Sequence, residues 1–125
     1  LFHSHLLELI DMMTVFFSAR YSYHVSRAIS YIFRCRYQPL LPHEVADFLH
    51  IDRTYLARIF KEETGQTLTQ YIRQVKIRGA AELLTTRLYR MTEIAEMLGY
   101  RDYSHFCHSF RKVYGLSPRE WIKEH

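Results

Sequence analysis

The chain has 125 residues, of which 48% are hydrophobic, and a formal net charge of +4. This length permits one compact core or two very small cores that share an element. The longest apolar runs fall far short of the roughly 18 residues that a membrane span requires, so the sequence predicts no transmembrane helix. Lys and Arg number 17 against 13 Asp and Glu, a balance that permits a polyanionic partner without demanding one.

The composition predicts an all-α fold. Only four Gly and three Pro are present, no alternation of period two persists, and several apolar stripes have helical period. Cys35 and Cys107 lack a C-x-x-C partner, so we expect neither a disulfide framework nor a structural zinc site. With no secretory signal in the sequence, the reducing cytoplasm is the expected location.

Residues 1–22 are expected to form an N-terminal helix. Its apolar residues repeat at spacings of four and three, which is a heptad seam: Phe2, Leu6, Leu9, Met13 and Phe16. Two heptads are fewer than the three or four that establish a coiled coil. Two interpretations therefore stay open, a self-association helix that would support a homodimer, and the end of a further effector or dimerisation domain.

The next segment predicts an amphipathic helix that packs on the first repeat described below. Its apolar residues follow the i, i+3, i+4, i+7, i+8 pattern of one helical face: Val25, Ala28, Ile29, Ile32 and Phe33.

A repeat organises the rest of the chain. The hexapeptide EVADFL at 44–49 returns as EIAEML at 93–98. Downstream, matching residues lie 50 positions apart, as in the pairs Asp52 and Asp102, Phe60 and Phe110, and Gly65 and Gly115. The repeated unit has the pattern of a helix, a tight turn, a second helix and a stop. We predict two helix-turn-helix units, at about 42–63 and 91–114.

Local signals place the helix ends. Pro42 suits the first position of a helix, and Glu44 favours its positive N-terminal end. Thr92 is the candidate N-cap of the second unit, and Gly99 allows a positive φ in the turn that follows. The remaining signals are an apolar stripe of Val45, Phe48 and Leu49, N-caps at Asp52 and Asp102, C-terminal glycines at Gly65 and Gly115, and capping boxes at Thr67–Gln70 and Ser117–Glu120.

The second helix of each unit is expected to bury one face and expose the other. In the first repeat the inner residues are Leu56, Ile59 and Phe60, and the outer ones are Arg53, Thr54, Ala57, Arg58 and Lys61. In the second repeat the inner residues are Tyr103, Phe106, Phe110 and Val113, and the outer ones are Arg101, Ser104, His105, His108, Arg111 and Lys112.

A linker helix is predicted at about 67–85, between the units. Its apolar and small residues lie along one side: Tyr71, Ile72, Val75, Gly79, Ala80, Leu83 and Leu84. The seventeen residues from Leu68 to Leu84 would span roughly 25 Å as a helix, which can hold two units near the roughly 34 Å repeat of successive major grooves.

These residues resemble the DNA-binding domain of AraC/XylS-type transcription regulators over 23–124. The resemblance rests on EVADFLHIDRTYLARIFKEETG, on KIRGAAELL, and on EIAEMLGYRDYSHFCHSFRKVYGLSP. It implies a bacterial protein with a seven-helix, homeodomain-like domain at 23–125, in which two helix-turn-helix subdomains enter adjacent major grooves of double-stranded DNA. It also implies RNA polymerase as a partner and, for most members, activation of transcription.

The resemblance also implies site residues. The positions matching the base-contacting sites of the family are Thr54, Ala57 and Arg58 in the first unit and Ser104, His105 and His108 in the second. His108 departs from the family, since many members have Arg there, and we expect the first unit to carry more sequence specificity. The basic residues Arg53, Lys61, Arg101 and Arg111 are the candidate phosphate contacts.

Other functions find less support in the sequence. His105 and His108 share a helical face, but no carboxylate completes a close ligand set, so we expect no metal. No catalytic triad order, phosphate-binding glycine loop or carboxylate pair is visible, and we expect no enzymatic activity and no cofactor. The alternatives that stay open are a helical protein-interaction module and a DNA-delivered enzyme whose chemistry lies in another segment.

Overall fold

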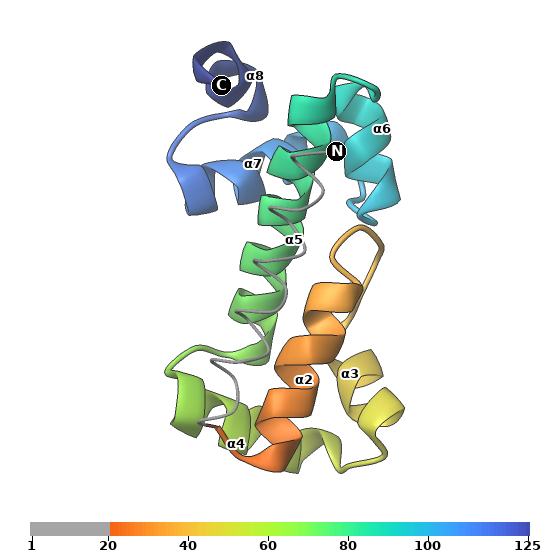
Figure 1. Cartoon of the computed structure of the whole chain (residues 1–125), viewed down its shortest axis with the longest axis vertical. Helices are drawn as coiled ribbons and strands as arrows, with labels where there is room; N and C mark the ends of the chain where they lie inside the picture. The colour runs from red at the N-terminus through yellow and green to blue at the C-terminus, as the bar shows by residue number, and fades with distance from the viewer. Residues whose placement is uncertain (1–20) are drawn as a thin grey trace. The chain divides into compact units, whose positions relative to one another are not determined.

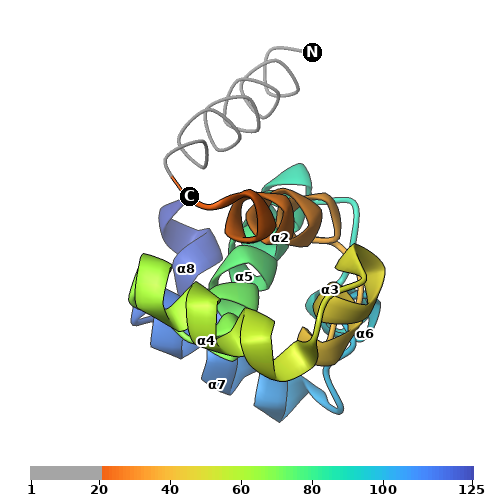
Figure 2. The ribbon, with the colours of Figure 1, turned by 90° about the horizontal axis from the view of Figure 1, so that it is seen from below.

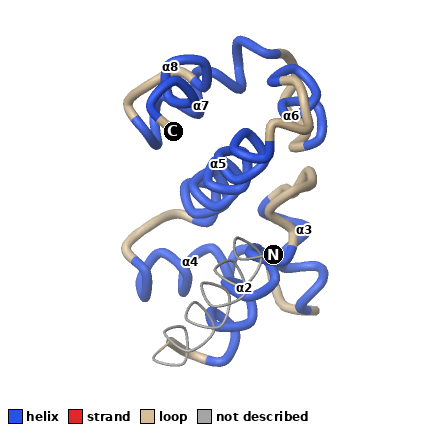
Figure 3. Tube along the Cα trace, turned by 45° about the horizontal axis from the view of Figure 1, so that its top comes forward, coloured by secondary structure: helices blue, strands red, loops and turns tan. Residues whose placement is uncertain are grey.

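The computed structural model describes residues 21–125, and in this range it contains seven helices and no strand (Figures 1 and 3). The helices are α2 (Tyr23–Arg34), α3 (Pro42–Leu49), α4 (Arg53–Thr64), α5 (Leu68–Thr86), α6 (Met91–Met97), α7 (Tyr103–Tyr114) and α8 (Pro118–Glu124). The predicted all-α, seven-helix fold is confirmed. The heptad seam from Phe2 to Phe16 lies outside the described residues.

The chain forms two compact units. The first unit contains α2, α3 and α4. The second unit contains α5, from Thr69 onward, with α6, α7 and α8, and also the connection Cys35–Leu41, which we call the strap. The chain therefore passes from one unit to the other three times, after Arg34, after Leu41 and after Leu68.

In the first unit, α2 packs on α3 and α4 through one apolar face (Figure 2). Val25, Ala28, Ile29 and Ile32 are buried, as the spacing predicts, whereas Phe33 is only partly buried. At the start of α2, the Ser22 N–H donates to the Glu63 carboxylate of α4 over 2.8 Å. The predicted amphipathic helix and its packing on the first repeat are confirmed.

The helix-turn-helix of the first unit is α3 and α4. Helix α3 begins at Pro42, with Glu44 in its first turn, as predicted. The Asp52 carboxylate accepts a hydrogen bond from the Tyr55 N–H over 2.8 Å and caps α4. Gly65 ends α4 with φ of 79°, and its N–H donates to the Lys61 carbonyl.

The exposure of Phe48 contradicts part of the predicted apolar stripe of α3. Val45 and Leu49 are buried, but the Phe48 side chain is 51% exposed. Its ring stacks on that of Tyr31 from α2, with centroids 3.9 Å apart and planes 12° from parallel. One face of the ring is covered and the other is open, so this position is part of the surface of the unit.

The core of the second unit surrounds α5. It consists of Ile77, Ala80, Ala81, Leu84, Ile94, Ala95, Leu98, Phe106, Phe110 and Trp121. Helix α5 ends two residues later than Leu84, at Thr86. Ile77 and Ala81 are 0% and 4% exposed, although neither was predicted on the buried side of this helix. The linker helix is therefore buried on more than one side.

Helix α6 begins one residue before the predicted cap. The residue at the N-cap is Arg90, and Thr92 lies inside the helix. The Glu93 carboxylate accepts from the Arg90 N–H over 2.8 Å. A guanidinium group cannot accept hydrogen bonds, so Glu93 supplies the capping here alone, and the predicted role of Thr92 is wrong.

The other helix ends predicted in the second unit are confirmed. The Asp102 carboxylate accepts from the His105 N–H over 2.8 Å and caps α7, and Gly115 ends it with φ of 76°. Before α8, the Ser117 N–H donates to Glu120 over 3.0 Å, and the Glu120 N–H donates to the Ser117 hydroxyl over 3.1 Å. These hydrogen bonds hold the pKa of Glu120 below its usual value.

Within the second unit, the strap lies against α5 and the turn after α6, because two glycines leave space for it. A Cβ atom at Gly79 would lie 2.9 Å from the Arg36 carbonyl oxygen, and one at Gly99 would lie 2.7 Å from the Pro39 Cβ. The Tyr37 hydroxyl donates to the Glu82 carboxylate of α5, which also lies 3.5 Å from the Arg36 Nε.

Candidate nucleic-acid interface

The outer face of α4 carries the polar residues that the repeat predicted. The outward residues Arg53, Thr54, Ala57, Arg58 and Lys61 are all exposed, and the inward residues Leu56, Ile59 and Phe60 are buried. The buried stripe fixes the rotation of the helix, and the Asp52 cap fixes where it begins. Helix α4 therefore presents a polar, basic face along its length.

Arg53 is held at the start of α4 by a bidentate ion pair with Asp47 of α3. Its Nε lies 3.1 Å from Oδ1 and its Nη2 2.9 Å from Oδ2. The hydrogen bonds from Arg53 lower the pKa of Asp47, and the same pair raises the pKa of Arg53. A guanidinium has five N–H donors, so Arg53 can contact a phosphate with the remaining ones while it keeps this pair.

Arg58 lies between two neighbours on the same helix. Its Nη1 is 3.3 Å from the Glu62 carboxylate, one turn further on, and its guanidinium carbon is 5.2 Å from the Tyr55 ring centroid. An exposed i, i+4 pair is worth about 0.3–0.5 kcal/mol. A bidentate contact to a guanine edge provides roughly 1–3 kcal/mol of discrimination, so Glu62 would not prevent such a contact.

The outer face of α7 has the same organisation. The outward residues Arg101, Ser104, His105, His108, Arg111 and Lys112 are exposed. Arg101 lies 3.7 Å from the carboxylate of Asp102, which caps the helix. This face has imidazole groups at His105 and His108 where α4 has Tyr55 and Arg58.

Tyr100 supports this face, a role that the sequence patterns did not predict. Its ring meets the His105 ring edge to face, with centroids 5.2 Å apart and planes 78° apart. Burial raises the pKa of Tyr100, and the Lys76 Nζ of α5 lies 5.3 Å from the ring centroid. The aromatic residue directly after the turn glycine was the available signal, but only the structure shows that it contacts His105.

Two further kinds of site were sought among residues 21–125, a metal site and a membrane span. Between 21 and 125, no group of three His, Cys, Asp or Glu side chains is placed to hold a metal ion. Over the same range, every helix is too short or too polar to cross a membrane. Each unit is thus a helix-turn-helix with an exposed polar second helix, the architecture by which DNA-binding proteins read a groove.

Comparisons with known proteins agree with this class. A family model described as a helix-turn-helix domain matches residues 45–124. The C-terminal domain of AraT, a response regulator from Geobacillus stearothermophilus, superimposes with a TM-score of 0.77 and 34% identity, covering 85% of this chain and 88% of that one. The DNA-binding domain of AdpA, solved in complex with a target DNA, has a TM-score of 0.72 over 82% of this chain and 93% of its own. Its identity is 21%, and it shows the fold alone.

Curated relatives give the family. The xylose operon regulatory protein of Escherichia coli K12 is 32% identical over 97 residues, which cover 78% of this chain and 25% of that protein. A response regulatory protein of Staphylococcus epidermidis is 28% identical over 102 residues, or 82% of this chain and 40% of that protein. This chain belongs to the AraC/XylS-type family of transcription regulators and carries its DNA-binding domain. It spans two fifths or less of the length of these two relatives.

Proposed function

We propose that this chain binds a specific double-stranded DNA sequence and regulates transcription, with α4 and α7 entering adjacent major grooves. The observation that carries the proposal is the exposed polar face that the second helix has in both repeats. Three matching pairs of exposed positions carry polar or basic side chains, namely Thr54 and Ser104, Arg58 and His108, and Lys61 and Arg111, while Leu56, Phe60, Phe106 and Phe110 on the opposite faces are buried. A solvated helix face alone would not require the same set twice.

The proposed contacts follow from side-chain chemistry. Arg58 would read a guanine edge, Ala57 would meet a thymine methyl, and Thr54 would reach either kind of base. In the second unit the base contacts would come from Ser104, His105 and His108. The phosphates would be bound by Arg53, Lys61, Arg101 and Arg111, which position the protein without reading sequence.

The wider proposal rests on the family. The chain would form its DNA-binding domain from 23 to 125, act in the cytoplasm without a cofactor or enzymatic activity, and activate transcription together with RNA polymerase. Residues 1–22 would take part in dimerisation or belong to an effector domain.

Selection of bound sequences from random duplex DNA tests the proposal. We expect two short boxes about one helical turn apart. Arg58→Ala should lower affinity for the selected site by about 5- to 150-fold and relax preference at one position, the effect of losing roughly 1–3 kcal/mol of base contact. Unchanged preference would remove Arg58 from base reading.

Lys61→Ala should act differently, because a phosphate contact is independent of sequence. Affinity should fall for all duplexes alike, and the slope of log affinity against log salt should become shallower by about one unit. Lys123→Ala on α8 is the charge-matched control. Absence of any preferred site at moderate salt would favour a protein-interaction module instead.

A further inference from the structure

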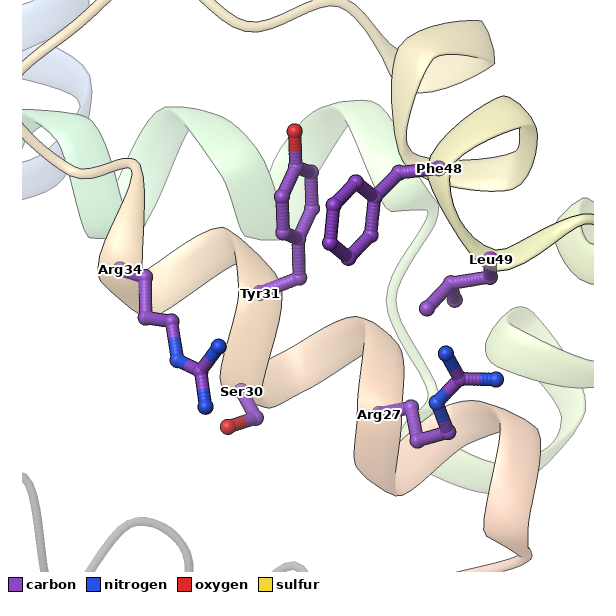
Figure 4. A pocket seen from close by; sticks show the side chains of 6 residues that line it. All are labelled: Arg27, Ser30, Tyr31, Arg34, Phe48 and Leu49. Carbon is purple, nitrogen blue, oxygen red and sulfur yellow. The ribbon is translucent and has the colours of Figure 1, made fainter.

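A groove lies between α2 and α3 in the first unit and has no part in the proposed DNA interface (Figure 4). Its volume is about 260 Å³, and its lining consists of Arg27, Ser30, Tyr31, Arg34, Phe48 and Leu49. None of the outward residues of α4 belongs to this lining. The groove is therefore a separate surface feature that the DNA-binding proposal does not explain.

The groove combines exposed apolar surface with positive charge. The stacked rings of Tyr31 and Phe48 form one wall, between the side chains of Arg27 and Arg34 (Figure 4). Phe48 is 51% exposed although it is the largest apolar residue of α3. Helix α2, with the sequence YHVSRAISYIFR, contains no acidic residue that could neutralise the two arginines locally.

Charge and shape together indicate the kind of ligand. Arginine binds carboxylates through paired hydrogen bonds, and arginine and aromatic side chains provide much of the binding energy in protein interfaces. Small-molecule pockets usually measure about 300–1,000 Å³, so this groove is better suited to a single inserted side chain. A nucleic-acid backbone would use the two arginines but would leave the exposed Phe48 ring without an apolar partner.

We propose that this groove binds a short acidic segment of another protein. The segment would insert one aliphatic or aromatic side chain against Phe48 and Leu49 and place carboxylates on Arg27 and Arg34. In this arrangement the domain has one surface for DNA and a second for a protein partner.

The test is a selection of short random peptides displayed on phage, with the whole 125-residue chain as bait and with the Arg27→Glu/Arg34→Glu double variant for counter-selection. We expect enriched peptides to contain several Asp or Glu residues around one large apolar residue. The most enriched peptide, labelled for fluorescence anisotropy, should lose at least about tenfold in affinity for the double variant, as expected for interface arginines worth about 1.4 kcal/mol or more. Phe48→Ser should also weaken binding of this peptide.

Matched controls separate this groove from general attraction to a basic protein. Arg119→Glu/Lys123→Glu, on α8, reverses two exposed charges outside the groove and outside the proposed DNA interface, and should leave peptide affinity unchanged. All variants should melt within a few degrees of the wild type, since the altered residues are at least partly exposed. No enrichment of acidic peptides, or equal binding to the double variant, would overturn the proposal. So would loss of duplex affinity in the double variant without a change in peptide affinity, which would assign both arginines to phosphates.

Discussion

His50 and Gly99 directly follow the repeated hexapeptide in the two units, and both have a left-handed backbone. Their φ angles are 58° and 85°. An L-residue with a side chain pays about 1–2 kcal/mol for this conformation, whereas glycine does not. The same turn is therefore built with a strained residue in the first unit and an unstrained one in the second.

We predict that His50→Gly raises the free energy of unfolding, by up to about 1 kcal/mol once the greater freedom of glycine in the unfolded chain is subtracted. Gly99→Ala should lower it, because the new Cβ would lie 2.7 Å from the Pro39 Cβ. Urea unfolding monitored by circular dichroism measures both. His43→Gly is the control, since glycine within α3 should destabilise by about 0.5–1 kcal/mol. A loss of stability in His50→Gly would show that the histidine side chain outweighs the strain.

Residue types predicted caps well and exposure less well. Asp52 and Asp102 were identified correctly because N-capping depends on two or three neighbouring residues. The prediction of Thr92 as the N-cap of α6 was wrong, because the Glu93 side chain caps the helix from within its first turn and no hydroxyl is needed at the N-cap. The prediction that Phe48 lies in a buried stripe was wrong, because periodicity gives the direction of a side chain but not how much of it the neighbouring helix covers.

Among the elements, the strap could not be predicted from sequence patterns. Its sequence, CRYQPLL, has neither helical nor strand period, and it comes from a part of the chain distant from α5. The strap contacts α5 at Gly79 and Glu82, whereas Ile77 and Ala81, which the predicted buried side lacked, belong to the core shared with α6, α7 and α8. Gly79 was predicted on the apolar and small side of the linker helix, and the structure shows that it allows close approach of the Arg36 backbone.

Tyr37 gives the strap a measurable signature. Burial, reinforced by the Glu82 carboxylate, raises the pKa of Tyr37 to about 12 from 10.0. The unfolded chain therefore loses this proton first as pH rises. The contribution of Tyr37 to stability should be fully present below pH 10 and be lost as pH rises toward about 12.

We predict that Tyr37→Phe removes the tyrosine that titrates near pH 12 in ultraviolet absorbance. The stability of this variant should also fall less steeply than that of the wild type above pH 10, in urea unfolding at stepped pH. Tyr23→Phe, which alters a ring that is 71% exposed on α2, controls for the loss of one hydroxyl. A Tyr37→Phe titration in which the missing absorbance change lies near pH 10 and not near pH 12 would contradict the burial of this hydroxyl.

For the whole molecule, the repeat made prediction possible. Capping residues, turn positions and inner stripes recur in both repeats, so each repeat supports the prediction of helices in the other. The placement of both second helices in adjacent grooves remains a prediction. The groove of Arg27 and Phe48 was not predicted, because α2 lies outside the repeat and its arginines read as the solvated side of an amphipathic helix.

The path of the strap has a consequence for how the chain can be divided. The sequence is a tandem duplication, but the halves are interleaved, since residues 35–41 precede the first helix-turn-helix and fold with the second. A cut at the apparent boundary would yield residues 69–125 without Leu40, whose side chain is 6% exposed. Burial of a leucine is worth about 1.5–3 kcal/mol, so this fragment should melt about 10 °C or more below a version with the strap attached by a flexible tether. Equal melting temperatures in calorimetry would show that the halves are modular after all; otherwise neither half can be exchanged between relatives as a single stretch of gene.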